Sequence, residues 1–430
     1  MTASLGKVLI VGTGPAAFQT AKILKNQCEQ LGLVNRSSER WKAMFESLHN
    51  ESIAHVIAAK PSLEPLAGQV IFDAIFEDLR AVGGEWDTLV IVTPSHAYAD
   101  VLVALPKSCL STIKIVVLIS SLFGGHQLVK GFFAELSLAP NVLVFSNYFA
   151  ATKFITGQAG IRVITKAVKK RIYAYSSQAE CAVLNLLAQT LADVSVAVVE
   201  LENGFSVEGR NITSFVHPAF FITPFSLNHI LSETREVKYM YKLFPEGPIT
   251  TETIHTLVEL WRDISRLMLH FNGTPFNLLQ FLNDDNYPVH PETIHRSQIK
   301  QFMSLTPIEQ EYLVYVRYSA ILIDPFSKPD TNGCYFDFSA VPYTKGKVEE
   351  GELYLPRIPR EDIQTLYWLQ VLGIEHGIAL PSINRVLGMF ESWLRESQLP
   401  NLLIEECHTQ AQKYLEWVRR ANELERETHE

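Results

Sequence analysis

The 430-residue chain lacks the features that mark several protein classes. Its five cysteines are scattered and include no CxxC pair, which argues against a disulfide framework and a structural zinc site. Its longest apolar runs, such as Ile115–Ile119, are far shorter than the roughly 18 residues of a membrane-spanning helix. The apolar run after Lys7 stops at Gly12, so we interpret it as a buried strand rather than a signal peptide. We therefore expect a globular, cytoplasmic protein.

An excess of positive charge is also missing. The chain has 37 basic and 46 acidic side chains, a net charge of −9, which is unusual for a nucleic-acid-binding protein. The charge is nevertheless uneven, because residues 1–190 hold 17 basic and 13 acidic side chains and residues 191–430 hold 20 and 33. The first part could host an anionic ligand, although an imbalance of surface charge alone explains the numbers equally well.

The first part is rich in short, continuous apolar runs of the kind that form parallel strands buried on both faces. Segments long enough for helices separate the runs, which are Val8–Val11, Leu31–Val34, Leu89–Val92, Ile115–Ile119 and Val142–Phe145. This alternation predicts an α/β fold with a Rossmann-like, doubly wound parallel sheet.

After about residue 200 the apolar pattern becomes helical. Thr251–Asn272 and Pro381–Glu396 each carry one apolar stripe, and Pro307–Ile323 is apolar nearly all round, which predicts a fully buried helix. Turn residues in Pro329–Pro359 predict a small β-hairpin. The chain thus divides into a cofactor-binding domain, residues 1–200, and a mainly helical substrate-binding or dimerisation domain, residues 201–430, since 430 residues are too many for one core.

The sharpest local motif is a G-x-G-x-x-A turn that begins at Gly12, between a predicted strand and a predicted helix. The glycines permit a tight turn and a close approach of the backbone to a pyrophosphate, which the N–H groups of the helix N-terminus bind. This context favours dinucleotide binding over a purely structural turn. The cofactor contacts expected here are Gly12, Thr13, Gly14, Pro15 and Ala16.

The end of the second predicted strand indicates which dinucleotide binds. An NAD enzyme places a carboxylate there for the ribose hydroxyls, whereas this chain has Arg36, Ser37 and Ser38. A guanidinium and hydroxyls suit a 2′-phosphate, so we expect NADPH, although Arg36 could instead belong to a surface turn. Thr93 and Pro94 follow another strand, where the nicotinamide half usually lies.

Several polar side chains in the second half could serve a reaction. Arg317 and Asp324 are seven residues apart, two turns on one helical face, in a segment too apolar for a lone charge. Such a charge needs a partner, either a second helix or a ligand, and the spacing leaves both open. A single histidine such as His217 is more often structural than catalytic, but its neighbours Arg210 and Asn211 favour a functional role.

Four segments of the second half closely resemble the bacterial opine metallophore dehydrogenases, the staphylopine and pseudopaline synthases. They are Tyr241–Thr250, Asn286–Thr293, Tyr315–Ser327 and Gly333–Pro342. The resemblance runs from the N-terminal glycine turn to about residue 345 and fades beyond residue 350.

The resemblance implies an NADPH-dependent reductive condensation in a Rossmann domain paired with a mostly helical domain, with the active site between them. A nicotianamine-like, histidine-derived amine joins an α-keto acid, and the imine is reduced to a metal-chelating opine. The enzyme itself needs no metal, and members of the family are typically homodimers.

The resemblance also assigns roles to individual residues. His217 matches the acid/base histidine of the family, and Asp324 is a candidate for the carboxylate that orients it. We expect cationic and polar side chains to bind the substrate carboxylates, namely Arg210, Asn211, Tyr241, Lys242 and Arg317.

The segment Phe145–Lys153 contributes Thr152 to the expected cofactor site and contains one departure from the family pattern. Ala151 stands where some members carry an aspartate, so the role of that carboxylate is not transferred to this chain. Pyruvate and 2-oxoglutarate both remain possible keto acids, and pyruvate is slightly favoured as the smaller and commoner compound.

Two other functions remain as alternatives. An NADPH-dependent 2-hydroxy-acid dehydrogenase would use a similar scaffold, and it would consume NADPH with a keto acid alone. A non-catalytic NADP(H)-sensing protein would bind the cofactor without turnover. The density of polar residues in the second half argues against a sensor, which has no need of them.

Overall fold

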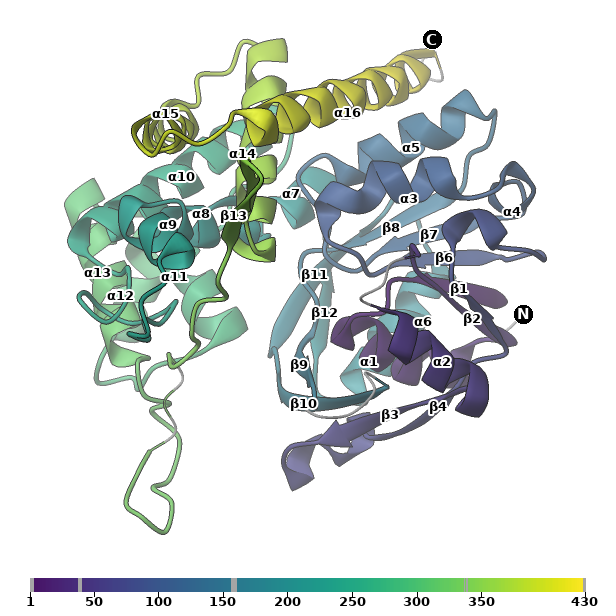
Figure 1. The fold of residues 1–430 in the computed structure, drawn as a ribbon, viewed down its shortest axis with the longest axis horizontal. Coiled ribbons are helices and arrows are strands. Elements are labelled where there is room, and N and C mark those ends of the chain that lie inside the picture. Colours follow the sequence, from purple (N-terminus) through teal and green to yellow (C-terminus); the bar gives the residue numbers. More distant parts are fainter. Residues whose placement is uncertain (1–3, 38–40, 156–160, 336, 338, 428–430) are drawn as a thin grey trace. The chain divides into compact units, whose positions relative to one another are not determined.

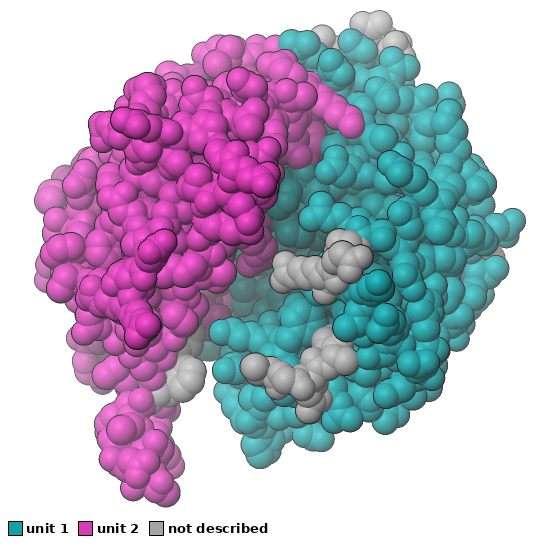
Figure 2. All heavy atoms as spheres, in the orientation of Figure 1, with its two compact units in different colours: residues 1–210, 416–430 teal, residues 211–415 magenta. Residues whose placement is uncertain are grey.

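The protein folds into two compact units. The computed structural model describes residues 4–37, 41–155, 161–335, 337 and 339–427. The first unit comprises residues 1–210 and 416–430, and the second comprises residues 211–415 (Figure 2). These bounds differ from the predicted division at residues 200 and 201. Residues 201–210 belong to the first unit because α7 (Gly204–Glu208) packs against its strands β8 and β11.

An eight-stranded sheet forms the centre of the first unit (Figure 1). Its spatial order is β12-β11-β8-β7-β6-β1-β2-β5, and all neighbouring strands are parallel except β8 and β11. The strands are β1 (Lys7–Val11), β2 (Gln30–Val34), β5 (Ala74–Phe76), β6 (Thr88–Ile91), β7 (Ile115–Leu118), β8 (Asn141–Phe145), β11 (Arg171–Ser176) and β12 (Ala197–Glu200). The predicted doubly wound parallel sheet is therefore confirmed.

Both faces of this sheet are covered by other elements, which explains the continuous apolar runs. In β1, Val8 and Ile10 join a core with residues of α1 and α6, while Leu9 and Val11 are buried on the opposite face. Figure 1 shows α3 and α5 near strands β6, β7 and β8. On the face of Val8 and Ile10, α1, α2 and α6 supply residues to the core. The helices are α1 (Pro15–Leu24), α2 (Lys42–Glu51), α3 (Tyr98–Ala104), α4 (Lys107–Leu110), α5 (Gly125–Glu135) and α6 (Ala182–Ala192).

A second sheet of four strands packs against α1. Its order is β4-β3-β10-β9, with β3 and β10 parallel and the two outer pairs antiparallel. The strands are β3 (Ile53–Ala58), β4 (Gly68–Ile71), β9 (Ala150–Phe154) and β10 (Arg162–Val168). Phe18 of α1 contacts the rings of Phe72 and Phe154, so α1 lies between the two sheets.

The second unit is mainly helical, as the apolar pattern predicts. Its helices are α8 (Val216–Phe221), α9 (Pro224–Leu231), α10 (Thr251–His270), α11 (Leu278–Gln280), α12 (Arg296–Gln301), α13 (Pro307–Ala320), α14 (Arg357–Glu375) and α15 (Pro381–Glu396), and α16 (Leu402–Glu427) continues into the first unit. A hairpin of β13 (Lys347–Glu349) and β14 (Glu352–Tyr354) confirms the predicted excursion. No helix in the described part of the chain has the length and apolarity needed to cross a membrane.

The prediction that Pro307–Ile323 is a fully buried helix is wrong in two respects. The helix, α13, ends at Ala320, and one of its faces is open, with Ile308 71% and Tyr312 64% exposed. The predicted amphipathic helices at Thr251–Asn272 and Pro381–Glu396 are confirmed as α10 and α15. A capping box formed by Thr250 and Thr253 fixes the start of α10.

Candidate active site

The glycine turn lies between β1 and α1, as the motif predicts. Gly12 has a φ of +119°, and a Cβ there would lie 3.0 Å from the carbonyl oxygen of Val92, so a side chain is excluded. Gly14 precedes the first turn of α1, and no described residue other than its chain neighbours comes within 4 Å of the position that its Cβ would take. Pro15 and Ala16 begin the helix and are partly exposed. The turn thus leaves room for a phosphate group at the N–H groups of α1.

The end of β2 lies beside this turn. Val34 pairs with Val11 in the parallel register, and the N–H of Gly12 donates to the carbonyl of Val34. Arg36 and Ser37 follow, and both are exposed. Ser38 lies outside the described residues. Arg36 therefore belongs to the segment that lies next to the glycine turn. A 2′-phosphate of a bound dinucleotide would bind at this segment.

Two threonines near the turn differ in how their hydroxyls are used. The buried Thr13 hydroxyl accepts a hydrogen bond from Asn35 Nδ2 at 2.5 Å. The buried hydroxyl of Thr93, after β6, has no hydrogen-bond partner among the residues that the structure describes. A buried polar atom without a partner is costly, so the Thr93 hydroxyl is suited to receive a ligand. Pro94 follows it and is partly exposed.

Thr152 belongs to an internal hydrogen-bond chain. Its hydroxyl contacts the hydroxyls of Tyr148 at 2.8 Å and Thr165 at 2.9 Å, and Thr165 donates to Gln19 of α1 at 2.5 Å. Burial raises the pKa of Tyr148 and keeps its hydroxyl protonated at neutral pH. The chain ties the second sheet to the helix that follows the glycine turn. A direct contact of Thr152 with the cofactor stays a prediction.

His217 lies on α8 and forms a pair with a buried carboxylate. Its Nδ1 is 3.3 Å from Oδ1 of Asp362 on α14, and its Nε2 is 3.4 Å from the hydroxyl of Tyr241. The ring of Phe221 packs against the imidazole, with the ring centres 5.3 Å apart. With Nδ1–H donating to Asp362, Nε2 is left as the atom that can accept or release a proton.

Burial also sets the protonation states around His217. It raises the pKa of the Asp362 carboxyl, while the charge and hydrogen bond of His217 oppose the shift. It raises the pKa of Tyr241 far above neutrality, so the phenol keeps its proton and can donate to Nε2. A buried carboxylate with a raised pKa beside a histidine is a common arrangement at functional sites.

Asp324 is not the partner of His217, which corrects the prediction. Because α13 stops at Ala320, the seven-residue spacing from Arg317 no longer places the two side chains on one helical face. Asp324 instead accepts a hydrogen bond from the N–H of Phe326 at 3.0 Å, inside a turn. Asp362 is the carboxylate that contacts His217. The sequence did not single it out, because α14 also carries Arg360, Glu361 and Glu375.

Arg317 is a buried cation held by carbonyl groups. Its Nη2 donates to the carbonyls of Leu282 at 2.8 Å and Tyr287 at 3.1 Å, and its guanidinium lies over the ring of Tyr318. No carboxylate pairs with Arg317 among the described residues, so its charge is not neutralised there. A ligand carboxylate would provide the missing negative charge. This is the second of the two alternatives that the sequence left open, a partner on a ligand rather than on another helix.

The other predicted substrate-binding side chains have protein partners. Lys242 forms ion pairs with Asp337 at 2.9 Å and Glu246 at 3.1 Å, which neutralise it. Asn211 accepts hydrogen bonds from Thr213. Arg210, in the first unit, donates to the carbonyl of Ser206 and lies over the ring of Tyr173. Their contact with substrate stays a prediction.

Sequence reasoning missed Arg357, the first residue of α14. Its side chain is 64% exposed and has a loose contact of 3.7 Å with Glu361, four residues along the chain. Its positive charge lowers the pKa values of both Asp362 and Tyr241, which places it near His217. The motifs recognised in the sequence ended before residue 350, so none of them pointed to this guanidinium.

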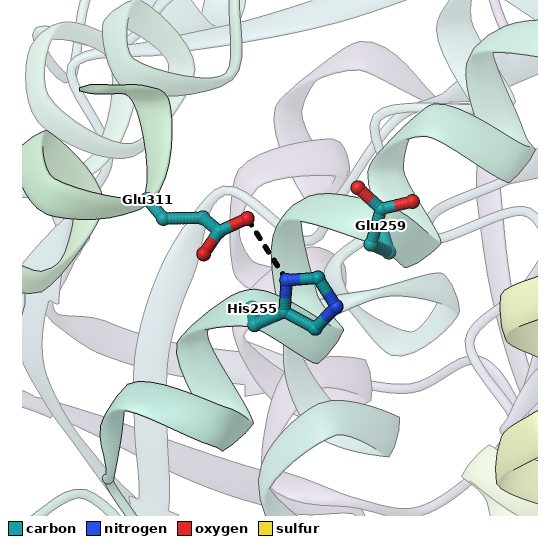
Figure 3. Close-up of side chains that lie close together, drawn as sticks. All are labelled: His255, Glu259 and Glu311. Carbon is teal, nitrogen blue, oxygen red and sulfur yellow. Dashed lines mark hydrogen bonds and ion pairs between the residues drawn. The ribbon is translucent and has the colours of Figure 1, made fainter. Parts of the chain in front are cut away.

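One group in the described part of the chain has metal-ligand chemistry: His255, Glu259 and Glu311, with ligand atoms within 4.8 Å of one another (Figure 3). His255 Nδ1 is 2.8 Å from a carboxylate oxygen of Glu311, and Glu259 pairs with Arg262. These contacts, at an exposed histidine, account for the group as a surface ion-pair network without a metal ion.

Most of the chain is similar to one known protein family. A family model described as staphylopine dehydrogenase matches residues 6–419. The pseudopaline synthase of Pseudomonas aeruginosa is 38% identical over 391 residues, which cover 90% of each chain. The staphylopine synthase of Staphylococcus aureus is 36% identical, again over 90% of each chain. The yersinopine synthase of Yersinia pestis is 32% identical over 94% of this chain and 96% of the relative.

Solved structures show the same likeness. Yersinopine dehydrogenase with bound NADP⁺ superimposes with a TM-score of 0.87 at 29% identity, covering 97% of this chain and all of that one (100%). Octopine dehydrogenase, in complex with NADH and agmatine, has a TM-score of 0.61 at 15% identity and covers 90% of this chain and 89% of its own. At that identity the second match concerns the fold alone.

Proposed function

The chain belongs to the staphylopine dehydrogenase family, and from that premise we propose that it is an NADPH-dependent opine dehydrogenase that makes a metal-chelating opine. This membership confirms the resemblance seen in the sequence. The substrates are an amino acid and an α-keto acid. In finer detail, a nicotianamine-like, histidine-derived amine condenses with pyruvate or 2-oxoglutarate, and the product is of the staphylopine or pseudopaline type. The observation that carries the proposal is the buried pair of His217 and Asp362.

NADPH is the cofactor, and the first unit has the features that fit it. The open turn at Gly14 and the N–H groups of α1 suit the pyrophosphate, and Arg36 and Ser37 suit the 2′-phosphate. Thr93, whose hydroxyl has no partner among the described residues, follows β6, and we assign it to the nicotinamide half. When bound, NADPH supplies the hydride that reduces the imine.

The second unit supplies the acid–base chemistry. The amine adds to the ketone to form a carbinolamine, which must lose water to become an imine before the hydride arrives. Protonated Nε2 of His217 donates its proton to the departing hydroxyl, and neutral Nε2 accepts a proton from the attacking amine. Asp362 holds Nδ1 and stabilises the imidazolium, and Tyr241 directs its hydroxyl at Nε2. The secondary amine and NADP⁺ are the products.

The substrate carboxylates need cations near His217. Arg357 has an exposed guanidinium near the pair, and Arg317 is buried and has no carboxylate partner among the described residues. The proposed role of Lys242 requires its release from Asp337 and Glu246. We also propose that Arg210 and Asn211 bind the substrate. We assign cofactor binding to the first unit and most of the substrate contacts to the second, with Arg210 the exception in the first unit.

We propose that the protein is located in the cytoplasm and forms a homodimer. The five cysteines, which are all free thiols, fit a reducing compartment, where NADPH is also available. The dimer rests on the family resemblance.

Product identification tests the function directly. The protein is incubated with NADPH, a nicotianamine-like histidine-derived amine and equal amounts of pyruvate and 2-oxoglutarate, and the product mass is measured. We expect loss of NADPH absorbance only when amine and keto acid are both present, with a product mass that identifies the acid. Consumption with a keto acid alone would indicate a 2-hydroxy-acid dehydrogenase. NADPH binding without turnover under every condition would indicate a sensor.

Arg357→Ala is expected to raise the KM of at least one substrate by about 10- to 100-fold, the value of one or two charge-assisted hydrogen bonds to a carboxylate. The Kd of NADPH should not change, because the expected phosphate contacts lie in the first unit. Initial rates at varied amine and keto acid give the KM values, and fluorescence titration gives the Kd.

Arg360→Ala is the matched control. Arg360 lies three residues further along α14 and pairs with Glu406 at 2.8 Å on the surface. This variant should keep both KM values. Equal effects of the two substitutions, or none from either, would contradict the role of Arg357.

A further inference from the structure

A fully buried carboxylate in the first unit has four hydrogen-bond donors around it. Glu208, the last residue of α7, is 0% exposed. Its Oε1 accepts from the Ser121 hydroxyl and from the N–H of His126, both at 2.8 Å. Its Oε2 accepts from the N–H of Gly124 at 2.8 Å and contacts Nδ1 of His126 at 2.9 Å. Every one of these donors comes from residues 121–126, which follow β7 and include the first two residues of α5.

These contacts hold the segment in one conformation. A buried carboxylate is costly unless donors surround it, and hydrogen bonds to an ionised acceptor are about twice as strong as neutral ones. Two of the N–H groups belong to the start of α5, where they lack partners within the helix and where the helix dipole favours negative charge. The ring of His126 also packs edge-on against Phe205 of α7, with centroids 4.7 Å apart. The carboxylate of Glu208 therefore fixes the chain that leaves β7.

The sheet register places this segment at the edge where a dinucleotide binds. Leu118 of β7 pairs with Ile91 of β6, and Ile91 pairs with Val11 of β1. The segments after these three strands therefore leave the sheet at the same edge, in the order of the glycine turn, Thr93 and residues 119–124. The glycine turn and Arg36 lie on the adenosine side, so residues 119–124 lie on the nicotinamide side.

We propose that Glu208 is a positioning residue for the nicotinamide half of NADPH. It does not contact the cofactor. Its carboxylate fixes residues 119–124 at the edge of the sheet, and this segment supports the nicotinamide ring in the orientation that hydride transfer requires. The inference rests on the proposed NADPH-dependent function, and it extends that function to a residue that neither a motif nor the glycine turn identifies.

Glu208→Gln tests this role through two ligands. Glutamine has the same size but replaces one acceptor oxygen by a donor, so the N–H of Gly124 or Nδ1 of His126 loses its acceptor. We expect the Kd of NADPH to rise about 10-fold, the effect of one lost charge-assisted hydrogen bond, and kcat to fall. The Kd of adenosine 2′,5′-bisphosphate, which contains only the adenosine half, should stay at the wild-type value. Calorimetric titration measures both.

Asp263→Asn is the matched control in the second unit. Asp263 is also fully buried, and it accepts the N–H groups of Ser382 and Ile383 at 2.8 and 2.9 Å at the start of α15. This variant should lose thermal stability without a change in either Kd. If Glu208→Gln raised the Kd of NADPH and of the bisphosphate equally, or left the Kd of NADPH unchanged, the proposal would be overturned.

Ser121→Ala is a milder test if Glu208→Gln does not fold. It removes one hydrogen-bond donor and should raise the Kd of NADPH by about 3-fold, while the Kd of the bisphosphate stays unchanged. An unchanged NADPH Kd would overturn the proposal. The Kd values can be measured without turnover. If the protein binds NADPH but makes no opine, the proposed function is refuted, and the Kd values still test the role of Glu208.

Discussion

Replacing His217 by asparagine lowers kcat by about 10²- to 10⁴-fold, the contribution of a positioned general acid–base group. Asparagine retains a polar side chain next to Asp362 but cannot exchange a proton near neutral pH, so the carbinolamine loses water slowly. The Kd of NADPH stays at the wild-type value because the glycine turn is unchanged. The rate is measured as the decay of NADPH absorbance at saturating amine and keto acid.

His255→Asn is the control for this substitution. His255 is an exposed histidine of the same unit that pairs with Glu311, so its loss should leave kcat unchanged. A His217→Asn enzyme that keeps most of the wild-type kcat would show that another group transfers the proton.

Replacing Asp362 by asparagine lowers kcat by about 100-fold, through the orientation and charge of His217. The neutral amide cannot stabilise the imidazolium, and with its NH₂ group toward Nδ1 it would favour the wrong tautomer. The KM values should change less than kcat, because Asp362 is buried behind the imidazole. Steady-state rates at pH 8 give both parameters.

The pH profile separates this role from a packing role. Burial raises the pKa of Asp362 above its ordinary value of 3.8, so the carboxylate becomes protonated at a higher pH than a solvent-exposed one. As the pH falls through this raised pKa, the negative charge beside His217 is lost, and we expect kcat to decline on the acid side. In Asp362→Asn this contribution to the acid limb is absent at every pH. An unchanged acid limb in the variant would contradict the assignment.

Asp324→Asn provides the comparison that decides between the two carboxylates. Asp324 caps a turn after α13 and should influence neither kcat nor the pH profile. A large effect at Asp324 together with a small one at Asp362 would restore the prediction made from the sequence.

The parts of the fold that could be predicted are those buried on both sides. β1, β6 and β7 appear as continuous runs of valine, isoleucine and leucine because helices cover both faces of the sheet. The second sheet gives no such signal, since β4 exposes three of its four residues and β9 has no buried residue. α16 is long but polar on average, and the sequence analysis did not predict it.

The parts of the site that could be predicted are those whose residues lie in one motif or directly after a predicted strand. The glycine turn, Arg36 and Thr93 follow strand ends, and parallel register brings strand ends together. The partner of His217 was not predictable, because Asp362 lies 145 residues away and only the packing of α14 against α8 brings it close. The spacing argument for Asp324 failed because it assumed that α13 continues past Ala320.

The last turns of α16 have a consequence for how the protein is made. Gly131 of α5 lies so close to α16 that a Cβ would be 1.8 Å from the carbonyl oxygen of Trp417, and the rings of Phe132 and Trp417 contact each other. Residues 416–427 thus cover the first unit, although 205 residues of the second unit (211–415) precede them in the chain. During synthesis from the N-terminus, the nucleotide-binding unit emerges first from the ribosome but cannot complete its surface until α16 has also emerged. Until then the apolar face of α5 is uncovered, and transiently exposed apolar surface of this kind is prone to aggregation.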